Sequence, residues 1–320
     1  MPVPWGAGRV HDCPHANPVV LSAALGESRA AVLIVFNPTA GRRRTHLLWR
    51  VLDVLARNGV RIDLVETHHA GHAEALARGA AAGGVPLVVA AGGDGTIAEV
   101  ANGLLGSPCR LGVIPLGTAN VLAHEFALAR APEAVAAALA FGRTRPLWPG
   151  IVRFDGASRL FVQMLGVGFD AQVVHGLPPA LKRRLGRGAY VVQSLREVAR
   201  YDFPRIRLRL DGVPAEAASV IVSKGRLYGG RYLLARGADP SVPGFSVALF
   251  ERGGPAAALM YGAALPLHLL ARAPGVRLLR AAEIEILDHP GLPAQTDGDA
   301  AGCTPVRVRD APGPISLVVG

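Results

Sequence analysis

The most restrictive feature of this sequence is a regular alternation of apolar runs with segments of helical periodicity over residues 31–91. The runs AVLIVF, RIDLV and PLVVAA are separated by THLLWRVLDVLARNG and HAEALARGAAAGG. Strands built almost entirely of Val, Leu, Ile and Ala are typical of a parallel sheet that helices cover on both faces. A helix is expected over residues 45–58, and Gly59 stands where helices commonly end. The pattern predicts a Rossmann-like α/β domain over residues 30–145.

The pattern changes after Phe141 to short strands punctuated by Gly and Pro, such as RLFVQMLGVGF, RIRLRLDG, FSVALF and ISLVVG. A chain of 320 residues exceeds what one hydrophobic core usually serves. We therefore expect a β-rich second domain over residues 146–320, whose last strand could return to the first domain. Residues 1–29 lack the charged start and apolar run of a secretory signal, so we interpret them as a loose leader.

The chain is strongly basic, with a formal net charge of +10. Only Lys182 and Lys224 are lysines, so 32 of the 34 basic residues are arginines. Such a charge attracts nucleic acid or an anionic membrane, but Arg, Ala and Gly richness is also what a GC-rich genome produces. In residues 177–200, KRRLGR precedes the helical pattern AYVVQSLREVAR, which could form a basic amphipathic membrane surface or a merely solvated face. No nucleic-acid partner is predicted, and peripheral membrane contact stays open.

A membrane span and an extracellular location are both disfavoured by the sequence. The longest apolar stretch, residues 256–271, is shorter than the roughly 20 residues a bilayer needs and contains Pro266 and His268. It is interpreted as a core or surface helix. The three cysteines are widely separated and odd in number, which fits a reducing cytoplasm. We expect a cytoplasmic protein, peripheral at the inner membrane surface if it contacts membrane at all, and the oligomeric state stays open.

Three glycine-containing loops each follow a predicted strand and open a predicted helix, which is where parallel-sheet proteins bind phosphates. The first is NPTAG at residues 37–41, followed by three arginines. Taken alone, it could be no more than a tight connection. Its backbone amides could also approach phosphate oxygens closely.

The second loop, GGDGT at residues 92–96, is harder to explain structurally, because three glycines give up backbone entropy around a carboxylate. Glycines permit a nucleotide to approach, Thr96 can donate to a phosphate, and Asp94 can hold magnesium or accept a proton. The alternative is an Asp-Gly turn before a helix. The third loop, PLGTAN at residues 115–120, looks by itself like a helix cap. All three loops at one sheet edge are better explained by a nucleotide site.

The motifs NPTAG, AAGGDGTIAEVANGL and LGVIPLGTANVLA resemble the nucleotide-binding motifs of the diacylglycerol kinase catalytic-domain family, which includes sphingosine kinases and bacterial lipid kinases. The similarity continues through VETHHAGHAEALA and GVGFDA and weakly to QTDGDAAG, so it covers most of residues 31–320. It implies an α/β domain like those of phosphofructokinase and NAD kinase, a C-terminal β-sandwich domain, and transfer of the ATP γ-phosphate to a hydroxyl of diacylglycerol or a related long-chain lipid.

The resemblance also implies roles for individual residues. Asp94 would organise Mg²⁺, and Asp299, at the end of a DGD sequence, would be the base that deprotonates the lipid hydroxyl. The cofactors implied are ATP and Mg²⁺, and the partner is a lipid at a membrane surface. The implied nucleotide-binding residues are Asn37, Pro38, Thr39, Ala40, Gly41, Thr67, Gly92, Gly93, Asp94, Gly95, Thr96, Ile97, Ala98, Glu99, Gly117, Thr118 and Asn120.

Two departures from the family pattern bear on this interpretation. Asp299 is one methylene shorter than the family's usual Glu, so its reach to the substrate proton depends on a closer backbone or an intervening water. The acidic DDG segment that binds a structural magnesium in the family corresponds here to DPSVPG at residues 239–244, where only Asp239 offers a carboxylate. We expect no structural metal there. The alternatives left open are a catalytically altered nucleotide-binding or regulatory module and an NAD kinase-like soluble kinase.

Overall fold

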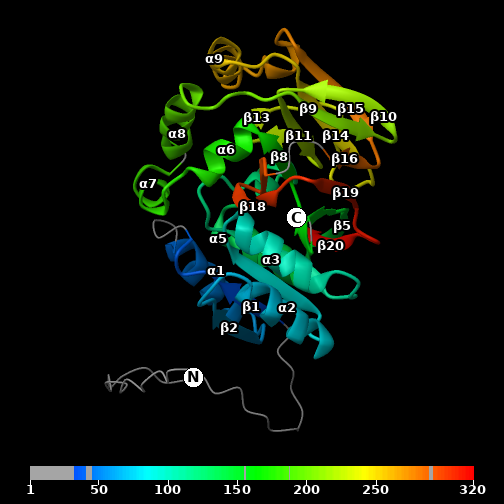
Figure 1. Cartoon of the computed structure of the whole chain (residues 1–320). Helices are drawn as coiled ribbons and strands as arrows, with labels where there is room; N and C mark the ends of the chain where they lie inside the picture. The colour runs from blue at the N-terminus through cyan, green and yellow to red at the C-terminus, as the bar shows by residue number, and fades with distance from the viewer. Residues whose placement is uncertain (1–31, 41–44, 155, 187, 288–290) are drawn as a thin grey trace, which may run out of the picture.

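The computed structural model describes residues 32–40, 45–154, 156–186, 188–287 and 291–320 (Figure 1). The leader predicted at residues 1–29 and the binding residue predicted at Gly41 lie outside the described residues. The chain begins with parallel strands alternating with helices, as the apolar runs predicted. The elements of the first half are β1 (Val32–Phe36), α1 (Thr45–Arg57), β2 (Ile62–Glu66), α2 (His72–Ala82), β3 (Leu87–Gly92), α3 (Asp94–Leu104), β4 (Arg110–Pro115), α4 (Val121–Glu125), α5 (Pro132–Phe141) and β5 (Arg143–Leu147).

The first sheet has the order β2-β1-β3-β4-β20-β5. Strands β2, β1, β3, β4 and β20 (Ile315–Val319) run parallel, and the edge strand β5 pairs antiparallel with β20. The C-terminal strand therefore lies inside the first sheet. The division proposed at residues 145 and 146 falls within β5, and the two-domain boundary stays a proposal.

Helices cover both faces of this sheet, which explains why its strands are apolar at almost every position. One face packs against α1 and α5, and the other against α2 and α3. The buried side of α1 is formed by Leu47, Leu48, Val51 and Leu55. Strand β3 has six buried residues in succession, which places it in the middle of the sheet.

The second half of the described chain forms two six-stranded antiparallel sheets that pack face to face. Their orders are β10-β9-β16-β19-β6-β7 and β15-β14-β11-β8-β17-β18. Inward-facing residues of both, among them Val152, Leu208 and Val247, form one core. The strands are β6 (Gly150–Phe154), β7 (Ala157–Phe161), β8 (Met164–Gly168), β9 (Ile206–Leu210), β10 (Val213–Ala217), β11 (Ser219–Ser223), β14 (Phe245–Phe250), β15 (Val276–Ala281), β16 (Ile284–Ile286), β17 (Pro293–Thr296), β18 (Asp299–Cys303) and β19 (Val306–Asp310). The predicted α/β domain and β-sandwich are both confirmed.

In the described second half of the chain, four α-helices and a short β-hairpin lie outside the two sheets. These are α6 (Phe169–His175), α7 (Pro179–Leu185), α8 (Gly188–Val198), α9 (Pro255–Ala264) and the strands β12 (Leu227–Tyr228) and β13 (Tyr232–Leu233). Figure 1 shows α7, α8 and α9 along one side of the molecule, with β18 next to α3 where the sandwich meets the first sheet. Across the described ranges, no helix is long and apolar enough to cross a bilayer.

Candidate active site

The three glycine loops lie side by side at the carboxyl end of the first sheet. Loop one (residues 37–40) follows β1, loop two (92–96) follows β3, and loop three (115–120) follows β4, and these strands are neighbours in the parallel sheet. The Asn37 amide N–H donates to the Ala91 carbonyl at 3.0 Å. The Asn37 side-chain Nδ2 donates to Thr96 Oγ1, also at 3.0 Å. The loops therefore form one connected structure, as the sequence predicted.

Loops two and three touch through their glycines. The backbone N–H groups of Leu116 and Gly117 donate to the Gly92 carbonyl at 2.9 and 3.0 Å. A Cβ atom on Gly117 would lie 2.5 Å from the Gly93 Cα, and one on Gly92 would lie 2.5 Å from Thr96 Oγ1. Only glycine fits at these two positions, because real Cβ contacts are never that short. Gly117 is thus also required for packing loops two and three together, and Gly92 for packing against Thr96 within loop two.

Asp94 is the first residue of α3 and faces the start of α4. Its Oδ1 accepts a hydrogen bond from the Leu122 backbone N–H at 3.3 Å. Burial raises the pKa of Asp94 to about 6, although this backbone N–H partly opposes the shift. A carboxylate kept in such surroundings, at a loop edge and not in a core, is typical of a functional site.

Asp299 reaches the same helix end from the other domain. A Cβ atom on Gly95 would lie 2.8 Å from Asp299 Oδ2, so the carboxylate sits directly over the first turn of α3. The structure therefore brings together the two carboxylates, Asp94 and Asp299, that the sequence assigned to one site across about two hundred residues of chain. Their roles stay a prediction.

The turn that presents Asp299 is fixed by the carboxylate of Asp297. Its oxygens accept backbone N–H bonds from Val162 at 2.8 Å and from Gln163 and Met164 at 2.9 Å each. Burial raises the pKa of Asp297 to about 7, with a further contribution from the negative charge of Asp94. Asp297 and Gly298 have φ of 52° and 85°, and the hairpin β17–β18 turns at these residues.

A second set of buried polar groups holds the Gly298 peptide. The Gly298 N–H donates to Gln295 Oε1 at 2.9 Å, and the Gly298 carbonyl accepts from the Tyr190 hydroxyl of α8 at 3.3 Å. Gln295 Nε2 in turn donates to Asp170 Oδ2 at 2.8 Å. Asp170 also accepts from the Tyr228 hydroxyl, and burial raises the pKa of both groups. The GVGFDA run was recognised in the sequence, but nothing local linked its aspartate to the turn before Asp299.

The remaining predicted residues divide into those at the loop edge and those turned away from it. Thr39 and Pro38 form the loop-one turn, in which Thr39 donates to Asn37 Oδ1 through its N–H and its hydroxyl at 3.0 and 2.8 Å. Thr118 is exposed, and its methyl group lies beside Gly186 at the end of α7. Asn120 is buried with φ of 47°, and its Oδ1 has no hydrogen-bond partner within the described part of the chain.

Two predicted residues have side chains directed away from the loops, and a third supports loop one through its backbone. Ile97 is fully buried in the core, so its side chain faces away from the loops. Glu99 Oε2 accepts from the Ala73 N–H at 3.2 Å and so holds the start of α2. The Thr67 N–H donates to the Phe36 carbonyl at 2.8 Å, which fixes the β2–α2 connection beside loop one. Ala40 and Ala98 offer no polar side chain, so either could contribute only through its backbone.

The loop in which the sequence predicted no structural metal is held by a lysine. Lys224 is fully buried, and its Nζ donates to the Val242 and Gly244 carbonyls at 3.3 and 2.9 Å and to Asp310 Oδ1 at 2.6 Å. Asp310 Oδ2 accepts from the Gly244 N–H at 2.6 Å. The ammonium thus lies where three oxygens converge. No local sequence pattern identifies Asp310, 86 positions away, as the partner of Lys224.

One further ion pair joins the two domains next to loop three. Glu125 at the end of α4 has a side chain that is 1% exposed, and it accepts from Arg226 Nε at 2.8 Å and from the Leu227 N–H at 3.0 Å. Leu227 and Tyr228 form β12, and Tyr228 is the residue whose hydroxyl donates to Asp170. The bonds to Glu125 therefore hold β12 against the first domain. No local sequence pattern links Glu125 to Arg226, which lies 101 positions away.

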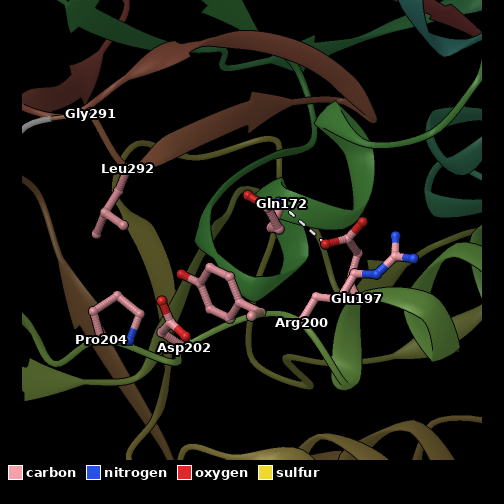
Figure 2. A pocket seen from close by; sticks show the side chains of 8 residues that line it. Gln172, Glu197, Arg200, Asp202, Pro204, Gly291 and Leu292 are labelled. Carbon is pink, nitrogen blue, oxygen red and sulfur yellow. Dashed lines mark hydrogen bonds between the residues drawn. The ribbon is translucent and has the colours of Figure 1, made fainter.

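A cavity of about 770 Å³ opens at a different place, between α6, α8 and the start of β17. Figure 2 shows that polar groups surround it, with Gln172 donating to Glu197 at 3.2 Å. Arg200 and Asp202 also line it, whereas Pro204 and Leu292 are its apolar members. Its lining mixes charged and apolar side chains.

The loop-edge residues fit a nucleotide and a hard divalent cation. Close packing of the glycines brings loops two and three together at the first turn of α3, and the buried Asn120 Oδ1 has no hydrogen-bond partner among the described residues. Asp94 and Asp299 offer only oxygen, which is the donor that Mg²⁺ prefers. In the described residues, no three His, Cys, Asp or Glu side chains lie close enough to hold a metal ion by themselves. A cation at Asp94 would therefore need ligands from phosphate oxygens and water, as Mg²⁺ commonly does.

Comparison with known proteins places this geometry in one family. Residues 31–150 match the diacylglycerol kinase catalytic domain, and residues 163–319 match the YegS C-terminal NAD kinase beta sandwich-like domain. A diacylglycerol kinase of Bacillus subtilis (strain 168) is 34% identical over 184 residues, which span 56% of this chain and 59% of that protein. A diacylglycerol kinase of Mycobacterium tuberculosis is 27% identical over 80% of this chain and 85% of its own length.

Solved structures agree with the fold. A crystal structure of a diacylglycerol kinase from Bacillus anthracis str. Sterne superposes with a TM-score of 0.67 at 18% identity, covering 90% of this chain and 96% of that one. A second crystal structure from the same organism has a TM-score of 0.75 at 20% identity and covers 94% of this chain and 99% of its own. With both domain types matched in order and the three glycine loops assembled at one edge, the chain belongs to the diacylglycerol kinase catalytic-domain family.

Proposed function

We propose that this protein, as a lipid kinase, transfers the γ-phosphate of ATP to a hydroxyl group of diacylglycerol or a related long-chain lipid. The observation that carries the proposal is the meeting of Asp94 and Asp299 at the first turn of α3, beside three phosphate-type loops. The family match and the names of the relatives support a lipid as the acceptor.

The glycine loops would bind the nucleotide through backbone N–H groups. The α3 N-terminus follows Gly93 and carries the positive end of an 11-residue helix dipole, which attracts phosphate. Thr39 and Thr118 lie in loops one and three, where their hydroxyls could donate to phosphate oxygens. Magnesium bound with ATP would neutralise phosphate charge, and Asp94 is the side chain that would hold it.

Asp299 would act on the acceptor hydroxyl. Phosphoryl transfer depends mostly on positioning and charge neutralisation, so a carboxylate within reach of the hydroxyl proton suffices as the base. The Asp297 carboxylate, bound by three backbone N–H groups, fixes the turn that carries Asp299. The backbone of this turn is anchored, so it cannot move to make up for the one methylene by which Asp299 is shorter than a glutamate. The acceptor hydroxyl must therefore bind close to the turn itself.

The test is transfer of labelled γ-phosphate from Mg-ATP to diacylglycerol, monoacylglycerol, sphingosine and ceramide in mixed micelles, with NAD in parallel. We expect phosphorylated lipid from the wild type. Asp299→Asn should reduce kcat by about 10²-fold or more and leave ATP affinity unchanged, because general base catalysis typically contributes that much. Asp53→Asn, at a surface ion pair of α1, is the matched control and should keep full activity.

The outcomes separate the alternatives. Product with NAD alone would assign the protein to the soluble kinases. Binding of ATP with no product on any lipid would favour a nucleotide-binding module without catalysis. Full activity of Asp299→Asn would disprove its role as the base while leaving the kinase assignment intact.

A further inference from the structure

Helix α4 touches the candidate cation ligand at one end and the second domain at the other. The Leu122 backbone N–H, in its first turn, donates to Asp94 Oδ1 at 3.3 Å. Its last residue is Glu125, and the helix contacts β12 of the second domain. A helix of five residues is only about 7.5 Å long, so a shift at one end moves the other end with it. Helix α4 therefore joins the end of loop three to a segment of the other domain.

Glu125 holds two consecutive residues of that segment. Its carboxylate accepts from Arg226 Nε at 2.8 Å and from the Leu227 N–H at 3.0 Å. Arg226 Nη2 also donates to the Glu125 carbonyl at 3.3 Å. The Glu125 side chain is 1% exposed, whereas that of Arg226 is 49% exposed. A buried carboxylate that accepts from a backbone N–H as well as a guanidinium fixes the position of the main chain, which an exposed ion pair does not.

A chain of hydrogen bonds runs from β12 to the turn that presents Asp299. Tyr228, the second residue of β12, donates through its hydroxyl to Asp170. Asp170 Oδ2 accepts from Gln295 Nε2 at 2.8 Å, and Gln295 Oε1 accepts from the Gly298 N–H at 2.9 Å. Gln295 is 1% exposed, and hydrogen bonds shielded from water hold their geometry more firmly. This chain ends on the residue directly before Asp299.

A second chain of hydrogen bonds leaves the same segment and reaches the same turn. The Lys224 N–H donates to the Gln163 carbonyl at 2.8 Å, and the Gln163 N–H donates to Asp297 Oδ1 at 2.9 Å. Both chains start within residues 224–228 and end in the turn that presents Asp299. The position of this segment therefore bears on where the candidate base lies.

We infer that Glu125 is a positioning residue, which couples the nucleotide site at Asp94 to the turn that presents Asp299. A nucleotide that binds loop three and, through its cation, Asp94 fixes the start of α4 from both sides. Glu125 passes this restraint to residues 224–228, and the two chains of hydrogen bonds pass it to the turn. Two sites that bias one shared element are coupled. The purpose of this coupling rests on the proposed function, since the turn carries the candidate base.

The test is hydrogen–deuterium exchange of the full chain, with and without Mg²⁺ and a non-hydrolysable ATP analogue, which requires no turnover. The measured groups are the N–H groups of Val162, Gln163 and Met164, which donate to Asp297. In the wild type the nucleotide should slow their exchange about fivefold or more, as is typical of coupling between two sites. Glu125→Ala should still bind the nucleotide, but the exchange should no longer respond to it.

Three further variants separate positioning from general loss of structure. Glu125→Gln keeps an oxygen for the Leu227 N–H and loses the charge, so it should keep part of the response. Arg226→Met should lose less than Glu125→Ala, and the double variant should lose no more than Glu125→Ala alone, because both act on one contact. Glu251→Ala is the matched control, since its ion pair with Arg277 at 2.9 Å lies within the sandwich, and it should respond as the wild type does. If Glu125→Ala does not fold, Glu125→Gln and Arg226→Met provide the same test.

The competing explanation is electrostatic. The negative charge of Asp94 helps to raise the pKa of Asp297, so a cation at Asp94 would also act on Asp297 through space. A full response to nucleotide in Glu125→Ala would assign the effect to this charge and overturn the inference. A wild type without any response would overturn it as well. Faster exchange in Glu125→Ala with an unchanged ratio between the two conditions would make Glu125 a structural residue only, and would count equally against positioning.

Lipid phosphorylation separates this inference from the proposed function. Glu125→Ala should lower kcat about tenfold or more while ATP affinity is kept, because a displaced base is poorly oriented toward the acceptor. A wild type that shows the exchange response but phosphorylates no lipid would refute the kinase proposal alone. Phosphorylated lipid without the exchange response would refute the coupling alone.

Discussion

Replacing Asp94 by Asn tests whether the candidate site is held at a cost in stability. Burial raises the pKa of this carboxyl group from 3.8 to about 6, so the folded protein resists its ionisation. Asn has nearly the same shape and keeps an oxygen for the Leu122 N–H, but it is never charged. The substitution should therefore abolish turnover and stabilise the protein at neutral and alkaline pH.

The sign and size follow from linkage. A carboxyl group whose pKa is raised on folding contributes stability below its unfolded pKa, and that contribution is lost as pH rises through the folded pKa. A rise from 3.8 to about 6 corresponds to about 3 kcal/mol as an upper limit. At pH 8 the free energy of unfolding of Asp94→Asn should exceed that of the wild type by up to this amount. The gain should shrink as pH falls through about 6 and vanish near pH 4. Removing the charge should also lower the pKa of Asp297, which Asp94 helps to raise.

The measurement is the unfolding midpoint in urea and on heating across this pH range, with a chelator present so that no cation offsets the charge. Asp63→Asn, at an exposed position of β2, is the control and should change stability by less than about 0.5 kcal/mol at every pH. If Asp94→Asn is neutral or destabilising at pH 8, the burial argument is wrong. If the Asp94→Asn variant is more stable but still active, burial of the Asp94 charge costs stability but the charge is not needed for catalysis.

Four other substitutions, at three positions, test other contacts. Gly117→Ala should reduce ATP affinity and destabilise the protein by about 1–3 kcal/mol, since its Cβ would lie 2.5 Å from the Gly93 Cα; calorimetric titration and thermal melts measure both. Asp310→Ala should cost about 3–5 kcal/mol in urea unfolding, because it leaves the Lys224 ammonium buried without its carboxylate. Gln295→Leu should lower kcat more than KM for lipid, and Gln295→Glu should not restore it, because the Gly298 N–H and Asp170 need an acceptor and a donor at once.

The first domain was predictable because its information is local. Near-continuous apolar runs, helical periodicity and glycine loops each occupy a few adjacent residues, and parallel strands bring their carboxyl ends to one edge. The predicted helix at residues 45–58 is α1, and loops one, two and three meet as expected. The apolar segment 256–271, interpreted as a core or surface helix, begins as the surface helix α9.

The site was predicted less completely because several of its contacts join distant segments. Asp297 meets the backbone of residues 162–164 across more than 130 positions of chain, and Glu125 meets Arg226 across 101. Periodicity cannot reveal such pairs. The contact of Glu99 is also non-local, since its carboxylate accepts from the Ala73 N–H at the start of α2.

Lys224 shows how a departure from a motif can carry structural meaning. The sequence shows an acid-poor loop at residues 239–244 and, separately, one of the chain's two lysines at position 224. In the structure the ammonium of Lys224 lies among two loop carbonyls and Asp310, a residue 86 positions away. The side chain therefore supplies a positive charge to oxygens of this loop. The backbone N–H of Lys224 also donates to the Gln163 carbonyl, and the Gln163 N–H donates to the Asp297 carboxylate. Lys224 is therefore two hydrogen bonds away from the turn that presents Asp299. Loss of this ion pair should then affect catalysis as well as stability, which the Asp310→Ala variant can separate by comparing kcat below its unfolding temperature with that of the wild type.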